Sequence, residues 1–177
     1  MHFLSSDNIL KHKEFLNNLK LKYSVLEKSF PFIKGKNIKD ISRMRISESD
    51  KNEIISLLGN IALHELYFDS FSKDFYPSEV VRQAYGSEAN FLYEMECEIL
   101  KNEPRGFMFV YFDKRRRPAF RHCVSFAESL LSFEPVLAID LCEHAYFMDY
   151  GFDRKRYVKC ALSHLNLNKI NDFCKTY

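Results

Sequence analysis

Hydrophobic side chains in the first seventy residues recur at the spacing of long amphipathic helices. Between positions 5 and about 29, apolar residues return every three or four positions with lysine and glutamate between them, which predicts a helix with one buried face. Phe30-Pro31 ends it, because proline has no amide hydrogen with which to continue a helix. A short helical turn is expected at 37–43, and SESD opens a second long helix from 47 through roughly 71. The pattern therefore predicts two long antiparallel helices.

The spacing changes after Pro77, where shorter elements follow one another. Two dense runs of aromatic and β-branched residues flank the basic turn KRRRP, which is typical of a β-hairpin. In chain order the pattern predicts helices at 78–84 and 87–100, strands at 107–112, 119–126 and 136–139, and a last helix from 154 to about 165. Helices followed by a small antiparallel sheet and a further helix indicate an α+β fold.

Composition and charge narrow the class of protein. With 46% hydrophobic and 15% aromatic residues, the 177-residue chain can bury a sizeable core, and wholesale disorder is excluded. The chain contains five glycines and five prolines, which argues against an all-β barrel with many tight turns. The formal net charge of +2 produces no global field that would draw the protein to nucleic acid or to an anionic membrane, so neither partner is expected.

The cysteines and the apolar runs bear on the location of the protein. The five cysteines form no CxxC pair, which suits reduced thiols in a cytosol better than a disulfide framework. The N-terminal residues lack the pattern of a secretory signal, and no apolar run approaches the roughly 20 residues that span a bilayer. We therefore expect a soluble, cytoplasmic protein.

The segment 136–150 carries the clearest candidate chemistry. Asp140 stands where a buried strand is expected to end, and His144 follows four residues later, so both side chains can converge on one cation. His64, on the apolar flank of the second long helix, is a further candidate ligand. Two imidazoles and one carboxylate suit iron or manganese rather than a thiolate-bound zinc. On spacing alone, however, a buried histidine is more often a hydrogen-bonded core residue.

The same segment resembles a known family. The run D-L-C-E-H-A-Y at 140–146 is similar to the D-x-W-E-H-A-Y signature of iron/manganese superoxide dismutases. Further stretches resemble motifs of that family in the same order: FLNNL at 15–19 (Y-V-N-N-L), HELYF at 64–68 (H-x-x-F-Y-W), YGS at 85–87 (F-G-S), RGFMF at 105–109 (S-G-W-x-W) and Asn166 (the Asn of an N-W pair). The resemblance extends from about Asp7 to Leu167, nearly the whole chain.

The resemblance implies a fold and a metal. It implies a helical hairpin domain at 1–76 and an α/β domain at 77–177 with a three-stranded antiparallel sheet. It also implies one iron or manganese ion per subunit between the two domains, with iron favoured, and superoxide as the substrate. His64, Asp140 and His144 fall on three of the family's four protein ligands.

The resemblance implies a homodimer as well. Glu143 falls on the residue that, in the family, reaches across the dimer to the ligand histidine. A ligating histidine uses one nitrogen for the metal and offers the other N–H to a carboxylate. We therefore expect His144 to donate a hydrogen bond to Glu143 of the partner subunit across a two-fold axis.

The first helix departs from the family at its metal-facing positions. The fourth ligand, a histidine eight residues before a helical tyrosine, is Asp7 here, and that tyrosine is Phe15; a further family histidine is Lys11. These three positions share one helix face. His12 lies about 140° from Asp7 around the helix, so it is not expected to replace the missing ligand. Asp7 is the candidate fourth ligand, with an ordinary first-turn helix residue as the alternative.

Other positions around the implied metal also differ from the family. Phe147 stands where the family has a gateway tyrosine. Tryptophans of the family's pocket are replaced by Cys142, Phe107 and Phe109. Asn60 stands where iron enzymes often carry the glutamine that hydrogen-bonds solvent on the metal. The candidate catalytic positions are therefore Asn60, Phe15, Lys11 and Cys142.

Three functions are compatible with these features. The first is an iron-dependent superoxide dismutase, with activity impaired by a second carboxylate that favours the 3+ ion and by the lost gateway residues. The second is a catalytically inactive dismutase-like scaffold, of the kind found in mitochondrial ribosomes, with the KRRR turn at 114–117 as an RNA contact. The third is a non-haem iron protein with other oxygen chemistry. A solvated hairpin tip is the simpler interpretation of that turn, so we favour the first.

Overall fold

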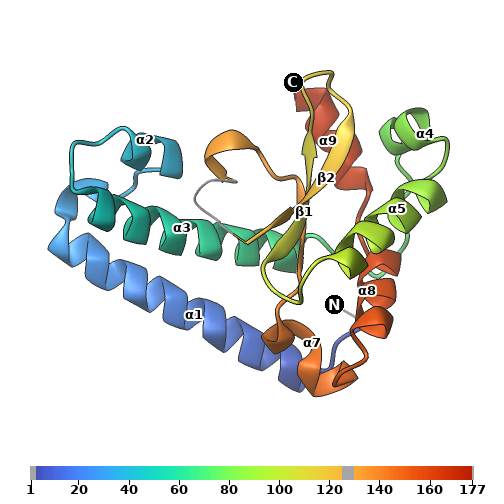
Figure 1. Cartoon of the computed structure of the whole chain (residues 1–177), viewed down its shortest axis with the longest axis horizontal. Helices are drawn as coiled ribbons and strands as arrows, with labels where there is room; N and C mark the ends of the chain where they lie inside the picture. The colour runs from blue at the N-terminus through green and yellow to red at the C-terminus, as the bar shows by residue number, and fades with distance from the viewer. Residues whose placement is uncertain (1–2, 125–129, 177) are drawn as a thin grey trace.

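The computed structural model describes residues 3–124 and 130–176. The chain begins with a helical hairpin in which two long helices run antiparallel and side by side (Figure 1). Its elements are α1 (Ser6–Ser29), the 3-10 turn η1 (Pro31–Ile33), α2 (Ile38–Ser42) and α3 (Glu48–Asp69). Both long helices begin close to the predicted positions, because the side chains of Ser5 and Ser47 accept hydrogen bonds from main-chain amides of the first turn.

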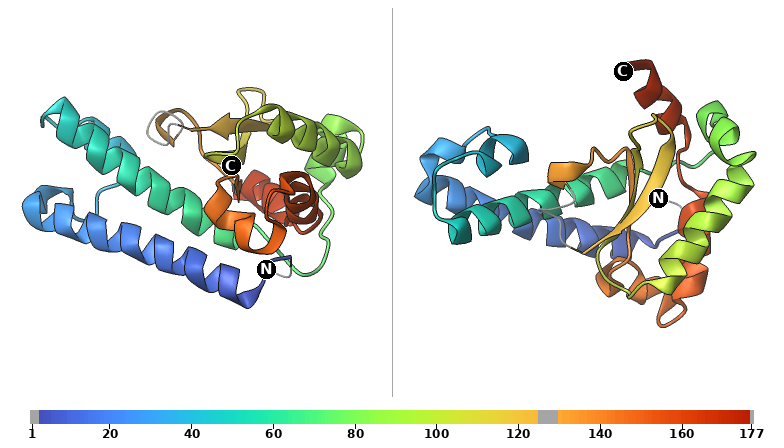
Figure 2. Two further views of the ribbon diagram at one scale, coloured as in Figure 1. Left: turned by 60° about the horizontal axis from the view of Figure 1, so that its bottom comes forward. Right: turned by 45° about the horizontal axis from the view of Figure 1, so that its top comes forward.

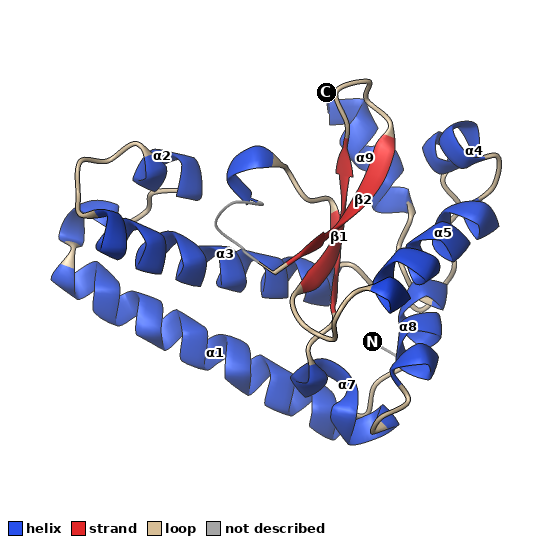
Figure 3. Ribbon diagram, in the orientation of Figure 1, coloured by secondary structure: helices blue, strands red, loops and turns tan. Residues whose placement is uncertain are grey.

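The rest of the chain surrounds a small sheet with helices (Figure 3). Its elements are α4 (Glu79–Tyr85), α5 (Glu88–Lys101), β1 (Phe107–Phe112), β2 (Pro118–Cys123), β3 (Leu137–Asp140), α7 (Glu143–Tyr150), α8 (Arg154–Ser163) and α9 (Asn168–Thr176). The three strands lie in the order β2-β1-β3, and both pairings are antiparallel. Helix α3 packs against β3, and helices α4 and α5 pack against β2.

The central strand β1 fixes the level at which β3 ends. Phe107, its first residue, lies opposite Cys123 on one side and Asp140 on the other. All four residues of β3 are buried, in keeping with an almost wholly apolar strand. Asp140 thus ends a buried strand, as the sequence predicts, and α7 begins three residues later.

One hydrophobic core joins the hairpin to the sheet. Leu63 and Tyr67, near the end of α3, pack in the same cluster as Phe107 and the buried residues of β3. The opposite end of the hairpin projects away from the sheet (Figure 2, left) and has a separate core of four isoleucines, Ile33, Ile41, Ile54 and Ile55. The end of the hairpin near the sheet is therefore the one held in place by the rest of the protein.

The predicted α+β fold with a three-stranded antiparallel sheet is confirmed, and two details differ. The helix from 154 is not the last, because α9 follows it. The second strand ends at Cys123, and positions 125–126 of the predicted strand lie outside the described residues. Among the helices of the described ranges, none is both long and apolar enough to cross a membrane.

Gly106 makes the sharp entry into β1. Its φ of +75° lies in the left-handed region, and a Cβ atom there would overlap the carbonyl oxygen of Cys123. The Gly106 carbonyl accepts a hydrogen bond from the amide of Leu141 at 2.9 Å. A glycine is required at this position, and it joins the start of β1 to the segment that follows Asp140.

Candidate metal centre

Four side chains from four different elements converge between the hairpin and the sheet. They are His12 of α1, His64 of α3, Asp140 at the end of β3 and His144 in the first turn of α7. Each offers one ligand atom, and these atoms all lie within 4.8 Å of one another. His12, His64 and Asp140 are buried, whereas the side chain of His144 is 35% exposed. The site thus lies at the edge of the core with one side facing outward.

Asp140 is at the centre of the group. Its Oδ2 lies 3.2 Å from Nε2 of His12, 3.4 Å from Nε2 of His64 and 3.0 Å from Nε2 of His144. Its Oδ1 accepts a hydrogen bond from the amide of Cys142 at 2.8 Å, and its main-chain carbonyl accepts one from the hydroxyl of Tyr157 at 2.6 Å. One carboxylate oxygen is therefore fixed by the backbone, and the other faces three imidazole nitrogens.

The protonation of His64 shows why this arrangement suits a cation. Its Nδ1 lies 2.8 Å from the carbonyl oxygen of Asn60, which can only accept, so Nδ1 is the donor. In a neutral imidazole, Nε2 then carries a lone pair, and this lone pair faces Asp140 Oδ2. Within the described residues, that oxygen and both ring nitrogens of His12 are buried without a well-aligned hydrogen bond. Lone pairs that converge in a buried site repel one another unless a cation lies between them.

Burial and mutual attraction set the charges of the group. Burial disfavours the charged form of His12 and lowers its pKa, although Asp140 opposes the shift. Burial alone would raise the pKa of Asp140, but its interactions with the three histidines outweigh that effect and hold the pKa well below its usual range. Asp140 is thus an anionic ligand at neutral pH, next to imidazoles that can donate lone pairs. Three nitrogens and one carboxylate oxygen are suitable for iron or manganese.

A pocket of about 430 Å³ reaches the group from the surface at His12 and His144. Its other lining residues are Lys11, Phe15, Glu143, Phe147 and Met148. The ring of Phe15 packs against His144 with 4.6 Å between centroids, and against His64 at 5.3 Å. Lys11, Phe15 and Phe147 therefore lie at the mouth of the candidate site, near His144.

The structure corrects the predicted contribution of α1. Asp7 is exposed and lies outside the group, and His12 is the residue that α1 brings to it. The buried residues of α1 are Asn8, His12, Leu16 and Leu19, which share one helix face. The prediction was wrong because it assumed that Asp7 faces the site, and it therefore excluded His12, which points about 140° away from Asp7 around the helix. The phase of the helix is set instead by the packing of its leucines against α3. The spacing of His12 from those leucines was the signal in the sequence that could have identified it.

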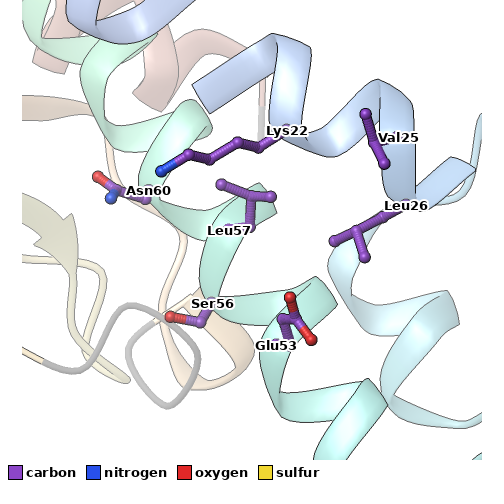
Figure 4. Close-up of a pocket in the computed structure, with 7 residues that line it drawn as sticks. All are labelled: Lys22, Val25, Leu26, Glu53, Ser56, Leu57 and Asn60. Atoms are coloured by element: carbon purple, nitrogen blue, oxygen red, sulfur yellow. The ribbon is translucent and has the colours of Figure 1, made fainter. Parts of the chain in front are cut away.

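Asn60 does not join the group through its side chain. Its carbonyl oxygen orients His64, as described above. Its side chain lines a different pocket between α1 and α3, together with Lys22 and Leu57 (Figure 4). An action of Asn60 on solvent at a metal therefore stays a prediction.

Cys142 lies directly beside the group as the residue before α7. Its Sγ accepts a hydrogen bond from the amide of Gly106 at 3.1 Å. Burial, together with the nearby charge of Asp140, raises the pKa of the thiol to about 12. Of the other two positions where tryptophan was expected, Phe107 meets His64 edge-on at 5.0 Å, and Phe109 packs near Phe133.

Comparison with known proteins identifies relatives of this chain. The sequence profile described as "Iron/manganese superoxide dismutases, C-terminal domain" matches residues 76–173, more than half of the chain. The chain belongs to the iron/manganese superoxide dismutase family. An iron superoxide dismutase of Cupriavidus metallidurans is 27% identical over 122 residues, which are 66% of this chain and 62% of that protein. A manganese/iron superoxide dismutase of Rickettsia typhi is 25% identical over 87 residues, 49% of this chain and 42% of the relative.

The family profile covers only two of the four candidate ligands. The family profile covers Asp140 and His144 but begins after His12 and His64. The chain also matches less than two thirds of the length of either curated relative.

Proposed function

We propose that this chain binds one iron or manganese ion, with iron favoured, through His12, His64, Asp140 and His144, and that it dismutates superoxide. The observation that carries the proposal is the convergence of three imidazole nitrogens on Asp140 Oδ2 in a buried site. When bound, such an ion supplies one-electron chemistry by alternating between 2+ and 3+, so that two superoxide ions and two protons yield oxygen and hydrogen peroxide.

The presence of His12 in place of Asp7 changes the expected chemistry. With Asp7 as the fourth ligand, two carboxylates would have favoured the 3+ ion and impaired turnover. With His12, the protein supplies three neutral imidazoles and one negative charge. That reason for impairment therefore disappears.

The mouth of the site supplies a different reason for slow turnover. Phe15 and Phe147 have no hydroxyl group with which to pass a proton to a reduced oxygen species. Among the described residues that line the pocket, Lys11 and Glu143 remain as groups near His144 that can exchange protons with solvent. We expect dismutation that is limited by proton delivery rather than by loss of the metal.

Metal analysis and a dismutation assay of the purified protein test the proposal. We expect about one iron or manganese ion per chain, metal loss in His12→Ala, and unchanged metal content in the control Asp7→Ala. Wild-type protein without bound metal would support the inactive scaffold instead. Metal without dismutation would leave other oxygen chemistry of a non-haem iron site.

We also propose a homodimer at α7. His144 turns Nε2 toward Asp140 and His64, and Glu143 next to it is exposed. Phe147 and Phe152 lie on the same surface, 45% and 91% exposed, with their rings in contact. A partner that covers these rings could place the partner subunit's Glu143 against His144 Nδ1. A monomer in light scattering at micromolar concentration contradicts this part of the proposal.

A cytoplasmic location is part of the same proposal. The described residues contain no disulfide, and Cys97, Cys160 and Cys174 lie within helices of the α/β part. Free thiols at these partly buried positions are compatible with a reducing compartment. Fractionation of cells that express the full chain tests this expectation.

A further inference from the structure

His12 differs from His64 in how its second ring nitrogen is placed. Nδ1 of His64 donates to the carbonyl oxygen of Asn60, one helical turn earlier, and this hydrogen bond leaves Nε2 free for a cation. For His12 to present Nε2 in the same way, its proton must lie on Nδ1. Within the described residues, however, Nδ1 of His12 is buried and has no hydrogen-bond partner. A buried N–H without an acceptor is costly, so the ring needs an acceptor nearby.

Asn8 carries a matching acceptor one helical turn earlier on the same buried face of α1. Its side chain is 1% exposed, and its Oδ1 is buried without a hydrogen-bond partner among the described residues. Side chains four residues apart on a helix are neighbours, with Cβ atoms about 5–6 Å apart. A donor without an acceptor and an acceptor without a donor thus occur together, next to the candidate metal centre.

The orientation of the Asn8 amide is fixed by Asp149 of α7. Asn8 Nδ2 donates to Asp149 Oδ2 at 3.0 Å, and the same oxygen accepts the amide of Ser5 at 2.9 Å. A carboxylate oxygen can only accept, so the nitrogen of the Asn8 amide must face Asp149 and its oxygen must face away. Asp149 therefore determines that Asn8 offers an acceptor, rather than a donor, on the buried face.

We propose that Asn8 is a positioning residue for His12: its Oδ1 accepts the Nδ1–H of His12 through one bridging water. Asp149 holds Asn8 in the required orientation, and His12 is thereby kept in the tautomer whose Nε2 can bind a cation. A single water with two polar partners in a buried site is an ordinary structural feature. The inference rests on the proposed function in that it takes His12 as a ligand.

The test measures the affinity for Zn²⁺ alone, by competition with a chromophoric chelator, so that no activity is required. Asn8→Ala should weaken binding about 10- to 100-fold, as loss of the partner of a ligating histidine typically does. Asp149→Ala should weaken binding less, because the amide of Asn8 can then turn either way. The control Asn171→Ala loses hydrogen bonds to Ser78 and Pro77 far from the site and should leave affinity unchanged.

An exchange of the two side chains separates positioning from general structural damage. In Asn8→Asp, a carboxylate would face Asp149, and affinity should fall. In the double variant Asn8→Asp/Asp149→Asn, the hydrogen bond between positions 8 and 149 is restored and an acceptor again faces His12, so affinity should recover. If Asn8→Ala does not fold, this pair of variants still decides the question.

A second readout reports directly on the ring of His12. In the Zn²⁺-bound wild-type protein, NMR should show His12 protonated at Nδ1, with slow exchange of that proton with water. In Asn8→Ala the same proton should exchange faster. The inference is overturned if Asn8→Ala binds Zn²⁺ as tightly as wild type while His12→Ala does not. If wild type and His12→Ala bind Zn²⁺ equally, the proposed metal centre itself fails.

Discussion

The two sides of the candidate metal centre are built in different ways. Asp140 and His144 are four residues apart in the chain, at the end of β3 and the start of α7, and the amide of Cys142 between them fixes the carboxylate. His12 and His64 come from α1 and α3, and no local contact of the chain brings them together. The first side is determined locally, whereas the second depends on how two helices pack.

This difference explains where the chain keeps the family pattern and where it departs from it. The locally built side lies in the matched region 76–173 and retains the carboxylate and histidine of the family signature. On the hairpin side, His64 keeps the position that the resemblance implies, whereas α1 brings His12 to the group, five residues after Asp7. The rotation of a packed helix decides which of its faces meets a neighbour, so a different position on the helix can supply the ligand while the fold is kept. Such a move is not available to a residue held by a tight turn.

The largest effect is expected at the tight junction beside Asp140. Gly106→Ala should lower the free energy of unfolding by about 2–5 kcal/mol, because the new methyl group meets the Cys123 carbonyl and φ is positive. The matched control is Gly35→Ala in the hairpin turn, where φ is +69° and no atom lies within 4 Å. There we expect about 1 kcal/mol, from the backbone alone. Equal losses in urea unfolding of the two variants would contradict the steric argument.

A buried leucine of α1 should come next. Leu16→Ala should cost about 2–3 kcal/mol in the free energy of unfolding, since Leu16 is 7% exposed and packs against Ile61 of α3. It should also weaken Zn²⁺ binding, because the same packing sets the direction of His12. The control Leu21→Ala, at a position 64% exposed, should change the free energy of unfolding by less than about 0.5 kcal/mol. Unchanged Zn²⁺ affinity in Leu16→Ala would show that His12 is held by something else.

Acidification should affect the two sides in separate pH ranges. The pKa of His12 is lowered in the folded protein, so the unfolded chain binds more protons and metal-free wild type loses stability as the pH falls below about 6.5. The pKa of Asp140 is also lowered, and its contribution should be lost only below about pH 4. Urea unfolding at pH 8, 6.5 and 5 measures the first phase, which cannot exceed about 1.4 kcal/mol per pH unit for one proton. The variant His12→Gln should not show this loss of stability between pH 7 and 5. The assignment to His12 is contradicted if wild type becomes more stable than His12→Gln over that pH range.

The smallest effect is expected at Asp7, the position where the resemblance implies the fourth ligand. Asp7→His restores the family's residue at its usual position, but this side chain is exposed in the first turn of α1. Metal content and dismutation should therefore stay unchanged, and stability should fall by a few tenths of a kcal/mol through loss of an acidic residue at a helix start. Metal analysis and thermal unfolding suffice as measurements. A clear rise in activity would place position 7 at the metal after all.

Much of this protein could be predicted from the sequence because the signals are local. Serine caps, apolar periodicity and the runs on either side of KRRRP identify the long helices and the hairpin strands within a few residues. The position of Asp140 at the end of a buried strand, and of His144 four residues later, follows from the same kind of pattern. Their convergence with His64 also agrees with the structure.

Tertiary packing decided which residue of α1 faces the site. One face of α1 carries Asp7, Lys11 and Phe15. The face with Asn8, His12 and Leu16 is rotated from it by about 100°. The helix itself is equally stable in either rotation, so the choice falls to contacts with another element, here Leu16 and Leu19 against α3. The same holds for the pairing of Asn8 with Asp149, which are 141 residues apart in the chain. The sequence by itself determined the elements, the local half of the site and the candidate His64, and only the packing of α1 determined which residue of that helix completes the group.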